Sequence, residues 1–363
     1  MGPRKLVFYT HALVGGGAER VWARLASGFS ARGDDVTFVV DFEERESLAF
    51  LSSAVSLHVL PRGHFRSTLA LARLIRKIRP DASLSAISVS NLKHTIAAKL
   101  AGRGNKAILS YHGYFDSEPE FLSRLGYRLT PLLTRLSAAT IAVSSGLRDN
   151  LVANFHATPT RTTTIFNPAA PEPFPVPLDA SALAARPPMV LAIGRLVADK
   201  DFVTLLRAFA RVKHPNARLT ILGEGRERAR LQAEAAALGI ADRVYMPGFV
   251  GDATHALASA RCFALTSLRE SFSLVCVEAL AFGLPVIATD CGGPREILDP
   301  PTLGQLAPVG AVEELARSID DCLMDPGDPA PRQDRARAFT LERALDQYDA
   351  LIDSVVRHKP PPA

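Results

Sequence analysis

Cysteine is scarce in this sequence and its apolar stretches are short, and both features narrow the possible classes of protein. The four cysteines all lie in the second half of the chain, and no two of them have the C-x-x-C spacing. This pattern favours reduced structural thiols over disulfides or a zinc site. No apolar run approaches the roughly 18 residues of a transmembrane helix, and no apolar signal region follows the first residues. We therefore expect a cytoplasmic location.

Aromatic residues are also few, at 7% of the chain, and they are not interleaved with the basic ones. This composition argues against a nucleic-acid partner. The charge is unevenly divided: 21 Lys and Arg face 12 Asp and Glu up to Asn167, a net charge of +9, whereas the remainder has 21 against 25, a net charge of −4. The basic half favours an anionic partner, such as a phosphate or an acidic bilayer surface, although a merely solvated basic surface would have the same composition.

Short β-branched runs alternate with amphipathic helical patterns throughout the chain, which predicts parallel sheets covered by helices. The strands expected in the first half are Leu6–Thr10, Val36–Asp41, Val55–Leu60, Ser83–Ser88, Ala107–Tyr111, Thr140–Ser144 and Thr162–Ile165. Those expected in the second half are Val190–Ile193, Leu219–Leu222, Val244–Met246, Cys262–Thr266 and Pro285–Thr289. The helices expected include Glu19–Arg32, Val203–Val212, Leu274–Phe282 and Leu341–Val356.

The length of 363 residues exceeds what one hydrophobic core usually supports, so we expect two domains. Seven prolines between Pro168 and Pro188 interrupt the alternation and predict a connection. The expected organisation is an α/β domain at 1–168, a linker at 169–188, a second α/β domain at 189–340, a helix at 341–357 that crosses back to the first domain, and a disordered tail at 358–363. Ligands of two such doubly wound domains are expected in an interdomain cleft, at the carboxyl ends of the strands.

A glycine cluster, Gly15–Gly17, separates the first expected strand from the first helix. Such a loop lets backbone N–H groups approach an anion at a helix N-terminus, although many glycine loops only make a turn. A dinucleotide fingerprint would require glycine where Arg20 stands. Asp41, at the end of the second strand, imitates the ribose-binding acid of NAD enzymes, so an NAD-dependent oxidoreductase remains an alternative.

The first strand of the second domain ends in Gly194-Arg195, and Lys200 follows five residues later. Two cations on a loop that leaves a strand can both bind one diphosphate, with Arg195 as a bidentate donor, but they can equally form surface salt bridges. Asp199 and Asp201 form a D-x-D pattern, which binds metal in other transferases. Beside two cations we do not expect a metal here.

Two glutamates, Glu270 and Glu278, lie eight residues apart around an expected helix start near Ser273. The free N–H groups of the first turn form an anion-binding terminus. Glu270 can accept hydrogen bonds from sugar hydroxyls, and Glu278, two turns inside the helix, can hold a ribose diol. Two exposed helix carboxylates would be the structural alternative, but Leu274, Val275 and Val277 make the surroundings apolar.

Together these motifs resemble the GT-B glycosyltransferases of family 4 over essentially the whole chain. Besides Glu270 and Glu278, the resemblance rests on GGGAER, on His112 in SYHG, on AVSSGLRDNL, on FNP at Asn167, on GRLVADK, on GEG, on PGF and on ALAFGLPVIATDCGGPREIL. The fold that it implies is two facing Rossmann-like, doubly wound domains with an interdomain cleft. The domain at 1–168 would bind the acceptor, and the domain at 189–340 would bind the nucleotide sugar.

The resemblance also assigns residues. The donor-binding set that it implies is Gly16, Gly17, Arg195, Lys200, Glu270, Phe272, Ser273, Leu274, Val275 and Glu278. The catalytic set that it implies is His112, Glu270, Arg195 and Lys200. Arg195 and Lys200 would bind the donor diphosphate, and Glu278 the ribose. One departure is Ser273, where many members carry glycine, and it leaves the identity of the sugar open.

The activity implied is metal-independent and cofactor-free transfer, with retention of configuration, of a hexose or N-acetylhexosamine from a nucleotide-diphosphate sugar. UDP is favoured and GDP is possible. The acceptor would be a glycan, commonly lipid-linked, in the synthesis of a bacterial surface polysaccharide or lipopolysaccharide. Basic and apolar residues at 66–79 and 124–136 predict peripheral attachment to the inner face of an anionic membrane. A sugar-nucleotide epimerase or a non-catalytic sugar-binding protein would share the architecture.

Overall fold

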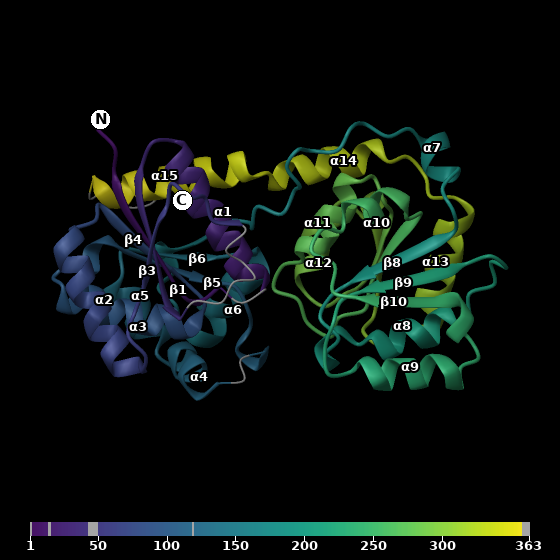
Figure 1. Ribbon diagram of the computed structural model, residues 1–363, viewed down its shortest axis with the longest axis horizontal. Helices are drawn as coiled ribbons and strands as arrows, with labels where there is room; N and C mark the ends of the chain where they lie inside the picture. Colours follow the sequence, from purple (N-terminus) through teal and green to yellow (C-terminus); the bar gives the residue numbers. More distant parts are fainter. Residues whose placement is uncertain (1, 14–15, 43–49, 118–119, 358–363) are drawn as a thin grey trace. The chain divides into compact units, whose positions relative to one another are not determined.

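The computed structural model describes residues 2–13, 16–42, 50–117 and 120–357. The chain divides into two compact units, each with its own sheet (Figure 1). Unit 1 comprises Met1–Pro168 and Leu341–Ala363, and unit 2 comprises Ala169–Thr340. None of the helices within the described residues combines the length and the apolar composition of a membrane-spanning segment.

Unit 1 is built on a seven-stranded parallel sheet whose central strands are buried, as the apolar runs predict. In spatial order its strands are β3 (Ser56–Val59), β2 (Asp35–Phe42), β1 (Lys5–Ala12), β4 (Ala82–Ala86), β5 (Ala107–Tyr111), β6 (Ala139–Ala142) and β7 (Thr162–Thr164). Its helices are α1 (Gly17–Ala31), α2 (His64–Ile78), α3 (Ser88–Leu100), α4 (Phe121–Arg128), α5 (Thr130–Leu136), α6 (Ser145–Phe155) and α15 (Leu341–Val356). The order, with β1 beside β4, is that of a doubly wound sheet.

The helices of unit 1 cover both faces of its sheet. Figure 1 shows α1 and α15 along one face and α2 and α3 along the other. The α1 helix packs closely on α15: a methyl group added at Gly28 would lie 2.6 Å from a methyl carbon of Leu345, and the rings of Trp22 and Tyr348 meet edge to face at 6.2 Å. Glycine at position 28 therefore permits the close approach of the two helices.

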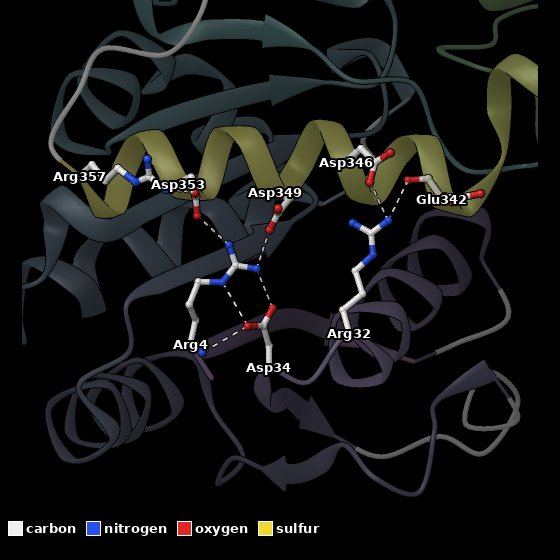
Figure 2. Close-up of polar contacts among 8 residues, drawn as sticks. All are labelled: Arg4, Arg32, Asp34, Glu342, Asp346, Asp349, Asp353 and Arg357. Atoms are coloured by element: carbon white, nitrogen blue, oxygen red, sulfur yellow. Dashed lines mark hydrogen bonds and ion pairs between the residues drawn. The ribbon is translucent and has the colours of Figure 1, made fainter. Parts of the chain in front are cut away.

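Ion pairs fix α15 to the start of the chain, as Figure 2 shows. The guanidinium of Arg4 lies 2.7 Å from Asp34 and reaches two carboxylates of α15, Asp349 at 2.5 Å and Asp353 at 2.9 Å. Arg32, at the end of α1, lies 2.7 Å from Asp346 of the same helix. The last helix of the chain thus completes the unit that the first residues begin.

Unit 2 repeats the doubly wound pattern with six parallel strands. In spatial order they are β10 (Val244–Gly248), β9 (Arg218–Leu222), β8 (Met189–Ile193), β11 (Cys262–Leu265), β12 (Val286–Thr289) and β13 (Gly304–Ala307). Its helices are α7 (Ala180–Ala184), α8 (Phe202–Phe209), α9 (Arg228–Ala237), α10 (Thr254–Ser259), α11 (Leu274–Ala281), α12 (Gly293–Ile297), α13 (Val312–Met324) and α14 (Ala330–Ala336). Two parallel, helix-covered sheets confirm the predicted fold class.

The proline-rich segment 169–188 is packed as part of unit 2, where a linker was expected. It contains the short helix α7, whose Leu183 is fully buried. The backbone of Leu178 donates to the Gln333 side chain at 2.9 Å, and Gln333 in turn donates to the carbonyl of Val176 at 3.0 Å. Proline prevents a long helix here, but side-chain hydrogen bonds still hold the extended backbone in place.

Two strands differ from the expectation. The strand expected at Ser83–Ser88 ends at Ala86, because Ile87 has a φ of 68° and Ser88 already begins α3. The edge strand β13 was not predicted, since its sequence GQLA contains no β-branched residue. The tail expected to be disordered at 358–363 and Gly15 both lie outside the described residues.

Candidate active site

The loop after β8 contains Arg195 and Lys200, the two cations that were expected to bind the diphosphate of the sugar donor. The backbone of Gly194 donates to Leu222, and that of Leu196 donates to Glu224, both at 2.9 Å, so this loop lies directly on the turn after β9. A methyl group added at Gly223, where φ is +149°, would lie 1.9 Å from the Gly194 carbonyl oxygen. The GEG turn contains glycine because its backbone lies in direct contact with the backbone of the loop that carries the cations, which leaves no room for a side chain. Arg195 is exposed, and no described residue forms a hydrogen bond or ion pair with its guanidinium.

Lys200 and Glu270, 70 residues apart in sequence, form a direct ion pair between Lys200 Nζ and Glu270 Oε1. Both side chains are largely buried, at 23% and 14% exposed. The Ser267 hydroxyl donates to the same Oε1 at 2.9 Å. Two of the predicted site residues are thus brought together, and Ser267, which the sequence did not single out, holds the carboxylate in place.

The segment around Glu270 is fixed to the glycine turn that follows β12. The backbone of Glu270 donates to the Cys291 carbonyl at 3.0 Å, and the backbone of Gly293 donates to Glu270 at 2.7 Å. A methyl group added at Gly293 would lie 2.6 Å from the α-carbon of Phe272. The close approach explains the pair of glycines after Cys291, and it sets the position from which α11 starts.

The predicted helix start is confirmed: Ser273 is the N-cap of α11, and the helix begins at Leu274. Ser273 has an extended backbone, with φ −133° and ψ 100°, so serine stands where many family members carry glycine without backbone strain. Its side chain is buried and does not cap the helix. The N–H groups of the first turn, including those of Leu274 and Val275, are thus not capped by the serine hydroxyl.

Phe272 and Glu278, the other predicted residues of this segment, are buried. Phe272 is 4% exposed and its ring packs edge to face on Phe339, with the centroids 5.6 Å apart. Glu278, two turns into α11, is 8% exposed. The alternative of two exposed surface carboxylates is therefore wrong for this pair, because both glutamates are mostly enclosed.

The D-x-D pattern beside Lys200 has a structural role in part. Asp201, with a φ of 43°, is the N-cap of α8, and its carboxylate accepts from the Thr204 backbone at 3.3 Å and from the Thr204 hydroxyl at 2.6 Å. The carbonyl of Asp199 accepts from Leu268 at 2.8 Å, which fixes the loop to the Glu270 segment. Metal-independence itself stays a prediction.

In unit 1, Gly16 is the N-cap of α1 and Gly17 its first residue. A methyl group added at Gly16 would lie 2.1 Å from a carboxylate oxygen of Glu19. The carboxylate of Glu19 therefore lies against this helix terminus. Contact of Gly16 and Gly17 with the donor stays a prediction, and it requires Glu19 to turn away from an incoming phosphate.

His112 directly follows β5, at the carboxyl edge of the sheet of unit 1. Its Nε2 lies 3.0 Å from the Ser110 hydroxyl, and the Trp22 ring packs edge to face against it at 5.9 Å. Burial lowers the pKa of His112 to about 3. The imidazole is therefore neutral at physiological pH, and acts as a hydrogen-bonding group without a charge.

Comparison with known families decides between the alternatives. The family model for glycosyl transferases group 1 matches residues 178–339, and that for glycosyltransferase family 4 matches residues 15–172. The chain belongs to the group 1 glycosyltransferases. The protein is thus a transferase, and the comparisons give no support to the epimerase or oxidoreductase alternatives.

Two bacterial glycosyltransferases align with this protein over nearly its whole length. The lipopolysaccharide core biosynthesis glycosyltransferase LpsE of Rhizobium meliloti is 27% identical over 347 residues, which cover 93% of this chain and 96% of the relative. A Campylobacter jejuni enzyme, N-acetylgalactosamine-N,N'-diacetylbacillosaminyl-diphospho-undecaprenol 4-alpha-N-acetylgalactosaminyltransferase, is 26% identical over 370 residues, which cover 97% and 98%.

Solved structures agree on the fold. The apo form of the lipopolysaccharide outer core galactosyltransferase WaaB superimposes with a TM-score of 0.77 at 20% identity, over 96% of this chain and 99% of that one. Anabaena HepE in complex with UDP-glucose superimposes with a TM-score of 0.82 at 22% identity, over 97% and 100%. The fold is therefore GT-B.

Proposed function

We propose that the protein transfers a hexose or N-acetylhexosamine from a nucleotide-diphosphate sugar, with UDP preferred, onto a lipid-linked glycan in the synthesis of a bacterial surface polysaccharide or lipopolysaccharide, with retention of anomeric configuration. The observation that carries the proposal is the ion pair of Lys200 and Glu270 beside the start of α11. It places a cation, a carboxylate and a helix N-terminus together, which are the groups that a sugar diphosphate needs.

Each of these groups has a distinct task in the proposed reaction. Lys200 and Arg195 stabilise the negative charge that develops on the leaving diphosphate, together with the partial positive charge of the α11 terminus. Glu270 accepts hydrogen bonds from hydroxyls of the transferred sugar and also holds Lys200 in place. Glu278 holds the ribose. The acceptor attacks on the same face as the leaving group, and the leaving diphosphate accepts the proton of the acceptor hydroxyl.

The relatives support the type of acceptor. LpsE is named for lipopolysaccharide core synthesis, and the Campylobacter enzyme for transfer to a diphospho-undecaprenol glycan. HepE has been crystallised with UDP-glucose, which supports a UDP-sugar as donor. Exposed apolar side chains of unit 1, which are described next, also support a lipid-linked acceptor.

Attachment to a membrane surface is part of the proposal, and the exposed apolar residues that we propose for it lie just before the segments 66–79 and 124–136 expected from the sequence. Leu71 and Ile75 of α2 pack in the core of unit 1 and cannot face a bilayer. The most exposed large apolar side chains of α2, α4 and α5 are at helix starts: Phe65 on α2 is 76% exposed and Phe121 on α4 is 74% exposed, whereas Leu132 on α5 is 51% exposed. Arg66 and Arg124 lie close to them in sequence and are also exposed. Aromatic rings beside arginines are suited to an anionic bilayer surface.

Vesicle co-sedimentation tests this attachment. Wild type should sediment with anionic vesicles and less as salt rises, and Phe65→Ser with Phe121→Ser should remain in solution. Substitution of Tyr245, an exposed aromatic residue of unit 2, by serine is the matched control. Equal sedimentation of the double variant and wild type would contradict the proposed surface.

The donor is tested by thermal shift with UDP-, GDP- and ADP-sugars. A nucleotide sugar at one hundred times its dissociation constant should stabilise the protein by about 2.7 kcal/mol. Incubation with the donor that binds and a membrane extract should give a glycosylated lipid, and proton NMR of the released glycan should show the anomeric configuration of the donor. Inversion would refute retention, and conversion of the donor without an acceptor would favour an epimerase.

A further inference from the structure

A cavity of about 560 Å³ is lined by residues of unit 1 alone. It opens at the carboxyl ends of β1 and β2, where His11 and Asp41 lie, and is closed by the start of α2 and by Lys93 of α3. Its volume is in the range of small-molecule sites. The carboxyl edge of a doubly wound sheet is also where such folds bind ligands.

Asp41 is fully engaged inside the protein. Both of its oxygens lie 3.1 Å from the Tyr9 hydroxyl, and Oδ2 also lies 2.6 Å from Lys93 Nζ and 2.5 Å from His11 Nδ1. Burial alone would raise the pKa of Asp41, but the hydrogen bonds from His11 and Lys93 outweigh it, and the pKa is lowered. An ionised carboxylate with three donors has little capacity left for the ribose diol of a dinucleotide.

Asp41 fixes the proton of the neighbouring histidine. An ionised carboxylate only accepts hydrogen bonds, so His11 Nδ1 must carry the proton. Nε2 is then the other polar atom of the ring, and no described residue forms a hydrogen bond with it. The ring is also held by packing, since Phe42 lies edge to face at 5.0 Å and His64 stacks on it at 6.0 Å. The cavity therefore presents an oriented ring nitrogen, which suits a hydroxyl because a hydroxyl can both donate and accept a hydrogen bond.

The charges that line the cavity are balanced. Lys93 is paired with Asp41, and the exposed Arg62 and Glu120 carry one charge of each sign. Neither Arg62 nor Glu120 makes a side-chain hydrogen bond or ion pair within the described ranges 2–13, 16–42, 50–117 and 120–357. A balanced set of donors and acceptors favours a neutral ligand with many hydroxyls over an anion.

We propose that this cavity binds a neutral sugar ring of the acceptor, and that His11 Nε2 forms a hydrogen bond with one of its hydroxyls. The inference rests on the proposed function for the meaning of that sugar, but the binding site stands on its own residues. His11 acts in sugar recognition, and Asp41 and Lys93 act as positioning residues that orient its ring.

Two substitutions at position 11 separate the two ring nitrogens. His11→Asn retains an amide that can donate to Asp41 near the place of Nδ1 but has nothing at the place of Nε2, whereas the longer His11→Gln can place its amide, which both donates and accepts, at the place of Nε2. His58→Asn, at an exposed position on β3, is the matched control. The probes are the methyl glycosides of glucose, galactose and N-acetylglucosamine, followed by saturation-transfer NMR at millimolar concentration, with UDP thermal shift measured on every variant.

At least one glycoside should bind wild type, His58→Asn should bind it equally, and His11→Asn should bind it about tenfold more weakly, as expected for loss of one hydrogen bond. His11→Gln should recover most of the affinity. Equal binding by His11→Asn, no binding of any glycoside to wild type, or tighter binding of inorganic phosphate in the cavity would each overturn the inference. If UDP stabilises neither wild type nor any of the variants while glycoside binding is intact, the proposed donor function is contradicted and the cavity proposal is not.

Discussion

Replacement of Lys200 by methionine tests the centre of the candidate site, because methionine keeps most of the volume of the side chain and removes its charge. The ammonium of Lys200 is paired with Glu270, which also accepts from Ser267 at 2.9 Å. The substitution therefore has two separable effects. It removes a cation from the donor diphosphate, and it leaves Glu270 with one hydrogen bond fewer.

The two effects differ in size. Loss of a charge-assisted hydrogen bond should weaken UDP binding by about 1.5–3 kcal/mol, which is roughly 10- to 150-fold. Loss of a charge that stabilises the leaving diphosphate should lower turnover further, to a total of about 10²–10³. The carboxylate left behind is partly solvated, so we expect destabilisation of only about 1–2 kcal/mol, or roughly 2–8 °C in Tm for a unit of this size.

The assay combines calorimetry with UDP, release of UDP during transfer, and thermal unfolding. Lys213→Met removes an exposed lysine of the same unit and should change none of the three. Glu270→Gln should retain the fold and lower turnover, because Lys200 then loses its partner. If Lys200→Met binds UDP and turns over like wild type, the diphosphate is bound elsewhere and the reasoning is wrong.

Four further outcomes follow from the same contacts. Arg195→Ala should lower turnover by about 10²–10³ while leaving Tm unchanged, since its guanidinium has no partner among the described residues, and steady-state kinetics with calorimetric unfolding checks both. EDTA should leave turnover intact, and recovery by manganese or magnesium after a loss would reopen the metal interpretation of Asp199 and Asp201. Arg4→Ala should destabilise unit 1 by about 1–3 kcal/mol in thermal unfolding, whereas Arg357→Ala, which removes an exposed i,i+4 pair, should cost about 0.5 kcal/mol or less. Burial lowers the pKa of His94 from 6.5 to about 3, so between these pH values the unfolded chain binds a proton that the folded chain does not. The free energy of unfolding should therefore fall as pH decreases from 6.5, by up to about 1.4 kcal/mol per pH unit. His94→Gln should reduce this dependence on pH in thermal unfolding.

The start of α11 could be predicted from the sequence because its determinants are local. A serine before an apolar run, with glutamates on either side, indicates a helix terminus wherever the segment lies in the fold. The pairing of Lys200 with Glu270 could not be predicted in the same way. It depends on how the loops after β8 and β11 meet, and the contact between Leu268 and Asp199 that brings them together is made by backbone atoms.

The cavity of unit 1 was missed for a different reason. Most of α3 is buried, including the polar residues Asn91, Lys93 and His94, so the helix has no amphipathic pattern and was not predicted. Its polar side chains have partners on the strands: His94 lies between the hydroxyls of Ser83 and Ser85, at 2.8 and 2.9 Å. Buried polar networks of this kind are visible only after the strands are placed. Asp41 was singled out from the sequence, but its partners were not.

The position of α15 has a consequence for the order in which the protein can form during synthesis. Unit 1 is started by the first 168 residues, yet the helix that covers Trp22 and Gly28 of α1 is translated only after the whole of unit 2. Unit 2 is continuous in sequence and can complete its core first. Until the ribosome reaches residue 341, one face of α1 exposes apolar surface and the guanidinium of Arg4 lacks two of its three carboxylates. Chaperones should therefore bind unit 1 before α15 has been translated, although unit 1 is the first part of the chain to leave the ribosome.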